Sequence, residues 1–250
     1  MLEFATTLAK QTGDYIRSRS AHAVTIEHKG RIDLVTEVDK AAQERIVSAI
    51  EQRFPDHGIL AEEDYRKDGG SGYAWIIDPL DGTTNFVHRL PVYAVSLALY
   101  REAKPLVGVC YNPVSGELFA AEAGQGATRN GAPIRVSTTT EIVNALVATG
   151  FPYRSQNLDK IAERFFRVIT QAQGVRRLGA AALDLCYVAC GIFDVFWEEG
   201  LAPWDMAAGS LILTEAGGRI TNLDGTPFDL KRGTVVASNS LLHDEILRCM

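Results

Sequence analysis

Apolar residues recur along this chain with two different spacings, and each spacing predicts one kind of element. Over residues 2–20 they return every three or four positions, which predicts an amphipathic helix. The same spacing returns after Asp39, which stands where a helix cap is expected, and it continues to Phe54, one position before a proline. The chain is therefore expected to begin with two helices that each bury one face.

Short apolar runs follow and predict a sheet. Ile59–Ala61 and Trp75–Ile77 indicate buried strands, and the second is expected to end at Pro79, whose nitrogen cannot donate to a sheet. Between them, residues 66–73 are charged and rich in glycine, which predicts a surface loop and a candidate lid. Three further strands are predicted at Val92–Tyr100, Leu106–Tyr111 and Glu117–Ala121. They are followed by Asn130-Gly131, a strong signal for a hairpin turn.

From about residue 141 the predicted strands and helices alternate. The strands are expected at Val143–Ala148, Val175–Leu178, Phe193–Trp197, Arg219–Asn222 and Val235–Ser238. The helices are expected at Leu158–Gln173 (with Ile161, Phe165, Phe166 and Ile169 inward), at Ala181–Cys190, at Asp205–Ala216 and at the C-terminus. The change of pattern predicts an α+β N-terminal subdomain, residues 1–140, and an α/β C-terminal subdomain, residues 141–250.

Charge and composition exclude some classes of function. The 25 basic and 31 acidic residues give a net charge of −6 without a basic stripe, so we expect no direct nucleic-acid binding. No apolar run approaches the length of a membrane span, and the charged N-terminal helix does not match a signal peptide. Cys186 and Cys190 lie in an apolar segment, which favours buried free thiols over a disulfide or a zinc site. A cytoplasmic protein fits these features.

Two carboxylates directly follow the strand at 75–77. Asp78 and Asp81 precede Gly82 and two threonines, and acids beside such a turn at a strand end suit a Mg²⁺–phosphate site. The same residues could instead form a capped turn, in which each aspartate accepts hydrogen bonds from nearby backbone N–H groups. This segment alone does not decide between the two interpretations.

Other carboxylates also stand at the ends of predicted elements. Glu62 follows the strand at 59–61 and would meet Asp78 if the two strands are neighbours in the sheet. Glu198 ends a later strand, and Asp205 precedes an apolar helix. Asp39 and Asp205 also fit ordinary helix caps, and the sequence leaves both roles open. The recurrence of acids at element ends in both halves suggests a cleft where the halves meet.

Together these segments resemble the inositol monophosphatase family. The resemblance covers nearly the whole chain and rests on I-D-L-V-T-E-V-D (32–39), A-E-E (61–63), D-P-L-D-G-T-T-N-F-V-H (78–88), L-G-A-A-A-L-D (178–184) and W-D-M-A-A-G with E-A-G-G (204–218). It implies a five-layered αβαβα sandwich of the sugar-phosphatase type, with two subdomains around a metal cleft and a homodimeric assembly. It also favours the metal interpretation of Asp78 and Asp81.

The resemblance implies a set of metal ligands. Family members use two or three Mg²⁺ ions and are sensitive to lithium. On that pattern one ion is held by Glu62, Asp78, the Leu80 carbonyl and Thr83, a second by Asp78, Asp81 and Asp205, and a third by Glu62 and water.

The resemblance also implies roles in catalysis and substrate binding. Catalysis is assigned to Asp39, Glu62, Asp81 and Thr83, with Thr83 hydrogen-bonded to Asp39 and orienting the attacking water. Substrate binding is assigned to Gly82, Thr83, Ala181, Glu198 and Asp205. Glu63 would support the ligands from behind, and Lys29 falls near a lysine of the family.

The implied activity is hydrolysis of the phosphate monoester of a small polyol, inositol 1-phosphate first, by in-line attack of a metal-activated water. Fructose 1,6-bisphosphatase or dual activity is an alternative, and a regulatory partner of the transcription machinery is a further one. Ala61 and Ala180 depart from the glycine and serine frequent in the family. We interpret Arg176 and Arg177 as structural, although they could instead neutralise a second phosphate or pair with acids at a subunit interface.

Overall fold

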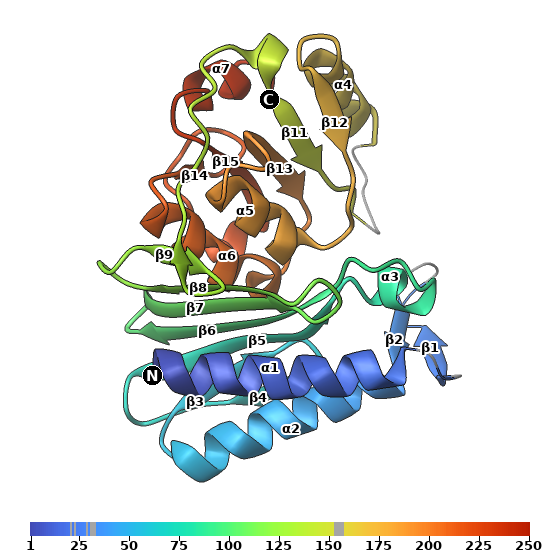
Figure 1. Cartoon of the computed structure of the whole chain (residues 1–250), viewed down its shortest axis with the longest axis vertical. Helices are drawn as coiled ribbons and strands as arrows, with labels where there is room; N and C mark the ends of the chain where they lie inside the picture. The colour runs from blue at the N-terminus through green and yellow to red at the C-terminus, as the bar shows by residue number, and fades with distance from the viewer. Residues whose placement is uncertain (21, 23, 29, 31–33, 153–157) are drawn as a thin grey trace.

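The helices and strands stack in five layers that alternate between helices and sheets (Figure 1). The computed structural model describes residues 1–20, 22, 24–28, 30, 34–152 and 158–250. The helical layers are α1 (Leu2–Arg19) with α2 (Glu37–Arg53), then α5 (Ala181–Ala189) with α6 (Pro203–Glu215), then α4 (Leu158–Ile169) with α7 (His243–Leu247). The αβαβα sandwich and the mixed fold class expected from the sequence are therefore confirmed.

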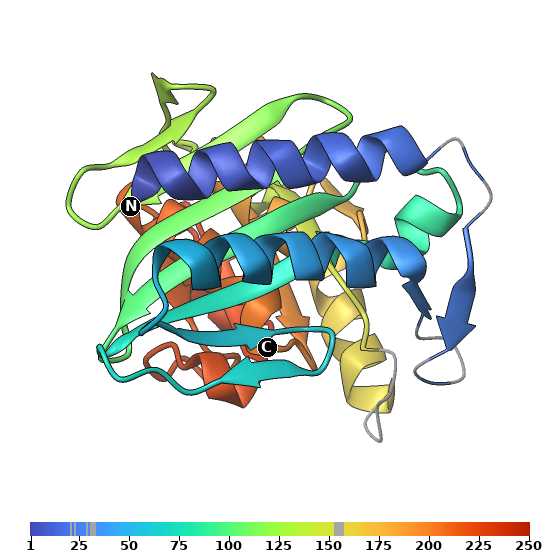
Figure 2. The same cartoon turned by 90° about the horizontal axis from the view of Figure 1, so that it is seen from below.

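The first sheet has eight strands in the order β10-β9-β8-β7-β6-β5-β3-β4. Their bounds are β3 Gly58–Ala61, β4 Tyr65–Lys67, β5 Tyr73–Asp81, β6 Ala94–Arg101, β7 Lys104–Asn112, β8 Glu117–Glu122, β9 Ala127–Arg129 and β10 Ala132–Pro133. Neighbours from β5 to β10 pair antiparallel, as the sequence predicts, and Asn130 and Gly131 both have positive φ in the turn between β9 and β10. Helices α1 and α2 lie side by side across one face of this sheet (Figure 2).

The second sheet has five strands in the order β12-β11-β13-β15-β14. Their bounds are β11 Leu146–Thr149, β12 Gly174–Arg176, β13 Val195–Glu199, β14 Arg219–Thr221 and β15 Thr234–Ser238. The prediction of a strand from Val143 was wrong at its start, because Ile142–Asn144 form one turn of 3₁₀ helix. A small separate sheet pairs β1 (Ile26–His28) with β2 (Leu34–Thr36), and α3 (Thr83–Val87) follows β5.

Each layer buries its apolar face against the next, but the outermost helix buries less than expected. In α4, Ile161 and Val168 are buried, whereas Phe166 is 63% and Ile169 is 43% exposed. The inward placement of Phe166 and Ile169 was therefore wrong. A helix in the outermost layer contacts the sheet along one stripe only, and the apolar residues of α4 are spread more widely around its axis than that stripe.

The glycine-rich segment predicted as a lid lies away from the acidic strand ends. Its first residues belong to β4, which pairs antiparallel with β3. Lys67 donates through Nζ to the carbonyl oxygen of Pro55 at 2.9 Å, and Ser71 donates through Oγ to that of Asp56 at 2.9 Å. These bonds fix the segment against the C-terminal end of α2, so the lid interpretation is wrong.

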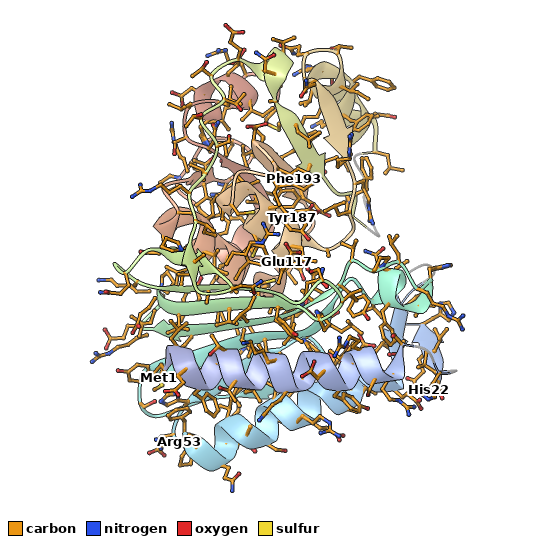
Figure 3. The ribbon with its side chains drawn as sticks, in the orientation of Figure 1. Met1, His22, Arg53, Glu117, Tyr187 and Phe193 are labelled. Carbon is orange, nitrogen blue, oxygen red and sulfur yellow. The ribbon has the colours of Figure 1, made fainter. Side chains whose placement is uncertain are left out.

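Polar and aromatic contacts attach α5 to the first sheet. The Tyr187 hydroxyl of α5 donates to Oε2 of Glu117 at 3.0 Å, and the Tyr187 ring packs edge-on against Phe193. Figure 3 shows Tyr187 between these two residues. Because Glu117 starts β8 and is nearly buried, this bond holds the helix to the sheet at a defined position.

The cysteines are free thiols, as predicted, although Cys190 is only half-buried. Across the part of the chain that the structure describes, no helix has the length and apolar character needed to cross a membrane.

His243 is buried in its neutral form and should make stability depend on pH. Its ring nitrogens lie 3.0 Å from the Thr221 hydroxyl and 2.8 Å from the Ser238 hydroxyl. Burial lowers its pKa to about 4, with Arg219 acting in the same direction and Asp244 opposing. Below its unfolded pKa of about 6.5 the unfolded chain binds the extra proton, so stability is complete above that pH and falls towards pH 4.

We expect this loss to be about 2 kcal/mol between pH 6.5 and pH 4. Urea unfolding in EDTA of the wild type and of His243→Gln measures it, because the other titrating groups are common to both proteins. Equal pH slopes in the two proteins would contradict the prediction.

Candidate active site

A single cleft of about 360 Å³ gathers most of the residues singled out in the sequence. It is lined by the end of β5, the first residues of α3, the end of β13 and the N-terminal ends of α5 and α6. Among the predicted residues it includes Glu62, Asp78, Leu80, Asp81, Gly82, Thr83, Ala181, Glu198 and Asp205. Asp39 and Glu63 are not part of the lining, and Asp39 lies in contact with Thr83.

Parallel pairing of β3 with β5 brings the first two groups of acids together. Ala61 pairs with Ile77 in this ladder, so Glu62 and Asp78 are the next residues on adjacent strands. The Glu62 N–H donates to the Ile77 carbonyl oxygen at 3.2 Å, which holds the two strand ends in register. The expected convergence of two acid-bearing strand ends is therefore confirmed.

A β-bulge places Asp78 and Asp81 on the same side of the sheet. The expectation that the strand ends at Pro79 was wrong, because β5 continues to Asp81 with a shift of register between Asp78 and Asp81. Residues three apart in a regular strand point to opposite faces, and one extra residue restores the same face. A bulge leaves a backbone nitrogen out of the ladder, so it accommodates Pro79.

Asp81 joins the first sheet to the middle helices. Its Oδ2 accepts a hydrogen bond of 2.8 Å from the N–H of Ala182, in the first turn of α5. Burial raises the pKa of Asp81 to about 7, the Ala182 N–H acts against this rise, and the nearby Glu62 charge adds to it. Asp81 is thus both a part of the cleft wall and a link between two layers.

Asp78 lies at the centre of the negative charge. It is 2% exposed, and its Oδ1 accepts from the N–H of Leu80 at 3.0 Å. Burial, followed by the charges of Glu62, Asp81 and Asp205, raises the pKa of Asp78 well above its usual range. Such mutual repulsion among buried carboxylates is unfavourable unless a cation joins them.

Asp205 and Glu198 bring carboxylates from the other side of the cleft. Asp205 is in the first turn of α6, and its Oδ2 accepts from the N–H of Ala202 at 2.7 Å. The N-cap of α6 is Ala202, so Asp205 is not the cap itself but accepts from the N–H of the cap residue, and it also lines the cleft. Burial raises the pKa of Glu198 to about 8, with Asp205 adding to the rise and Arg177 opposing it.

Thr83 connects the cleft to a buried carboxylate behind it. Its hydroxyl lies 2.8 Å from Oδ1 of Asp39 and 3.1 Å from the carbonyl oxygen of Leu80, and the single proton can be donated to one of them at a time. Asp39 is fully buried, and its Oδ2 accepts from the backbone N–H and the hydroxyl of Thr36. Burial raises the pKa of Asp39, and these hydrogen bonds oppose the rise. Asp39 thus completes the capping box with Thr36, the N-cap of α2, and also orients Thr83. The helix cap expected at Asp39 lies at Thr36 instead.

Replacing Thr83 tests this arrangement. We expect Thr83→Ala to lower turnover about 10²- to 10³-fold, because it removes the hydroxyl that lies between Asp39 and the cleft. Thr83→Ser is the matched control, since it keeps the hydroxyl and should retain most of the activity. Steady-state kinetics on both variants decides, and equal losses in the two would assign Thr83 a purely structural role.

Gly82 allows the chain to turn sharply from β5 into α3. Its φ is +91°, and a Cβ at this position would lie 3.0 Å from the carbonyl oxygen of Val92. A side chain would be both strained and crowded there, so glycine is required. The turn places Thr83 directly after the acids of β5 in the cleft wall.

The donor atoms of the cleft fit hard divalent cations. Carboxylates and a backbone carbonyl are oxygen ligands of the kind that Mg²⁺ and Ca²⁺ take. Within the described ranges, no group of three or more His, Cys, Asp or Glu side chains is arranged so that it could hold a metal ion. Any Mg²⁺ bound here would therefore need water or substrate oxygens among its ligands, as Mg²⁺ commonly has.

Some residues at or behind this cleft were not identified from the sequence, or were assigned a lesser role. Thr36 is the cap of α2 and a partner of Asp39, and the T-x-x-D spacing at 36–39 is a signal for it. Arg177 lines the cleft, although we interpreted it as structural from the sequence. Asp184 is buried behind the cleft, where the apolar sequence around it gives no signal. Lys29 lies outside the described residues.

Comparison with known proteins gives matches over the whole chain. A family model described as the inositol monophosphatase family matches residues 1–249. An inositol-1-monophosphatase from Synechocystis is 46% identical over 100% of this chain and 88% of that protein. A Nus factor SuhB from Pseudomonas aeruginosa is 43% identical over 96% of this chain and 92% of that protein.

The fold comparison agrees. The structure of the extragenic suppressor protein suhB from Bartonella henselae superposes with a TM-score of 0.96 at 36% identity. The superposition covers 99% of this chain and 96% of that one.

Proposed function

The chain belongs to the inositol monophosphatase family and is a phosphoric monoester hydrolase, and on that basis we propose that it hydrolyses the phosphate monoester of a small polyol, inositol 1-phosphate first. The observation that carries this proposal is the cluster of carboxylates at the joined ends of β3 and β5, of which Asp78 and Asp81 are buried. Fructose 1,6-bisphosphate, alone or as a second substrate, is the alternative within the same chemistry.

The family is metal-dependent, and Mg²⁺ is the metal we propose. Glu62, Asp78, Asp81, Asp205 and the carbonyl oxygen of Leu80 would hold two or three ions, with Asp78 shared between two of them. When bound, these ions supply Lewis-acid stabilisation of the phosphoryl oxygens and lower the pKa of a coordinated water.

The side chains of the cleft orient the reactants. While Thr83 donates its proton to Asp39, its oxygen can accept a hydrogen bond from the attacking water and orient that water. As the water loses its proton to the Thr83 oxygen, Thr83 could pass its own proton along the hydrogen bond to Asp39, whose pKa is raised by burial. Backbone N–H groups at Gly82 and Thr83 would bind the phosphate, and Glu198 with the backbone of Ala181 would bind the polyol.

Phosphate release tests the proposal directly. We expect Mg²⁺-dependent release from inositol 1-phosphate that EDTA abolishes and Li⁺ inhibits, with fructose 1,6-bisphosphate measured in parallel. The relative kcat/KM of the two substrates ranks them. Folded protein that releases phosphate from neither, at any Mg²⁺ concentration, would contradict the proposal.

The proposal also covers the location, assembly and subdomain organisation of the protein. We propose a cytoplasmic homodimer whose N-terminal subdomain, up to residue 140, carries most metal ligands. The C-terminal subdomain then supplies Asp205 and the substrate contacts. Light scattering and limited proteolysis measure the assembly and the boundary.

A second candidate function is a regulatory role in transcription. It is favoured by the relative named Nus factor SuhB, which matches nearly the full chain. Binding of purified RNA polymerase and Nus factors to immobilised protein tests it. An inactive Asp81→Asn protein that still binds would separate this role from catalysis, whereas no binding by either form would exclude it.

A further inference from the structure

Arg177 is a basic side chain in an otherwise acidic cleft. It follows β12 and lines the cleft beside Glu198, Gly179 and Ala180. Among the lining residues that the structure describes it is the only lysine, arginine or histidine, whereas Glu62, Asp64, Asp78, Asp81, Glu198 and Asp205 are acids. A cation is therefore presented to whatever occupies this cavity.

The backbone leaves room for the guanidinium group at this place. A Cβ at position 179 would lie 2.2 Å from Nη1 of Arg177, so the guanidinium rests against a residue without a side chain. Gly179 has a φ of +82°, a conformation that favours glycine independently. Asn85 fixes this segment by donating through Nδ2 to the carbonyl oxygen of Leu178 at 2.8 Å. The local path of the backbone therefore determines the position of Arg177 at the cleft.

The charge of Arg177 acts on the polyol side of the cleft. It opposes the rise in the pKa of Glu198 and of Asp184, while the leading influences on Asp78 and Asp81 come from burial, neighbouring carboxylates and backbone N–H groups. Asp184 is 1% exposed, and its Oδ1 has no hydrogen-bond partner among the described residues. Arg177 is therefore close enough to both acids for its charge to act on their pKa values.

Neither acid neutralises the guanidinium by direct contact. The Arg177 side chain makes no ion pair within 4.0 Å to any carboxylate in the described part of the chain. Its five N–H donors are therefore available to a ligand, and a planar fork of donors matches a phosphate group in two-point contact.

We propose that Arg177 binds a second anionic group of the substrate, remote from the reacting phosphate, so that a bisphosphorylated sugar or polyol has a higher kcat/KM than the matched monophosphate that lacks the second phosphate. This inference rests on the proposed function and narrows its substrate class. The reacting phosphate already has the metal-binding acids and the turn at Gly82 and Thr83, whereas the polyol side of the described cleft has Arg177 as its one cation.

Fructose 1,6-bisphosphate and fructose 1-phosphate form the matched pair of substrates, because they differ only in the second phosphate. For Arg177→Gln we expect kcat/KM on the bisphosphate to fall about 10- to 100-fold more than on the monophosphate, mainly through KM. Arg177→Lys should recover part of the difference, since it keeps the charge and loses the fork. Arg176→Gln is the control, because Arg176 is exposed and donates through Nη1 to the carbonyl oxygen of Val175.

The outcomes distinguish failure of the inference about Arg177 from failure of the proposed function. Equal losses on both substrates would overturn the inference and assign Arg177 to the reacting phosphate. Equal losses together with a change of assembly in light scattering would also overturn it and assign Arg177 to a subunit contact. Absence of phosphate release by the wild type from every ester would overturn the proposed function itself.

Discussion

Asp81→Asn is expected to lower turnover about 10³-fold, equivalent to about 4 kcal/mol of transition-state stabilisation, while the protein remains folded. The substitution removes one negative charge from the acids that we propose hold the metal. The asparagine carbonyl can still accept the hydrogen bond from the Ala182 N–H, so the link between β5 and α5 is retained. Steady-state phosphate release and circular dichroism on the same sample measure the two effects.

Asp81→Ala provides the comparison. It removes both the charge and the acceptor for Ala182, so we expect the same loss of turnover together with a loss of stability of about 1–3 kcal/mol. Near-normal turnover of Asp81→Asn would show that Asp81 is not a metal ligand, and a matching loss of stability in both variants would show that the asparagine does not preserve the link.

Asp78→Asn is expected to abolish activity and, in EDTA, to make the protein more stable by about 2 kcal/mol. Asp78 is almost completely buried beside three other acids, so without metal its charge opposes folding. Asparagine has nearly the same shape and can still accept from the N–H of Leu80. The gain in stability and the loss of function thus have the same cause.

Urea unfolding with EDTA and with Mg²⁺ measures this effect. Mg²⁺ should stabilise the wild type more than Asp78→Asn, because the variant has lost the shared ligand. Asp68→Asn is the control for removing a charge, since its ion pair with Arg66 is exposed and contributes little. A less stable Asp78→Asn protein in EDTA would contradict the view that the acids repel each other.

The layers of the fold follow closely from apolar periodicity, because the pattern of each element is set by what it packs against. Helices α1 and α2 and strands β6 to β8 are buried on their apolar faces, as their spacing predicts. Phe166 of α4 is different: the outer layer covers only part of that helix, and the width of the covered stripe depends on tertiary packing that a local pattern does not contain.

The candidate site was predictable where chemistry is concentrated in short motifs. Asp78 and Asp81 stand at a strand end in the sequence itself, and the neighbouring place of Glu62 follows once β3 and β5 are paired. Arg177 was undervalued for a different reason. Its guanidinium lies where Gly179 has no side chain, and this arrangement depends on the folded chain rather than on a local pattern.

Because of the bulge in β5, the geometry of the site depends on the number of residues between Asp78 and Asp81. Leu80 is fully buried, and as a ligand it would contribute only a carbonyl oxygen that every amino acid possesses. Pro79 occupies the one stretch of the strand where the ladder slips. Between Asp78 and Asp81 the number of intervening positions is therefore more constrained than their identity: an exchange of one side chain can leave the acids in phase, whereas an insertion or deletion reverses the facing of one acid relative to the other.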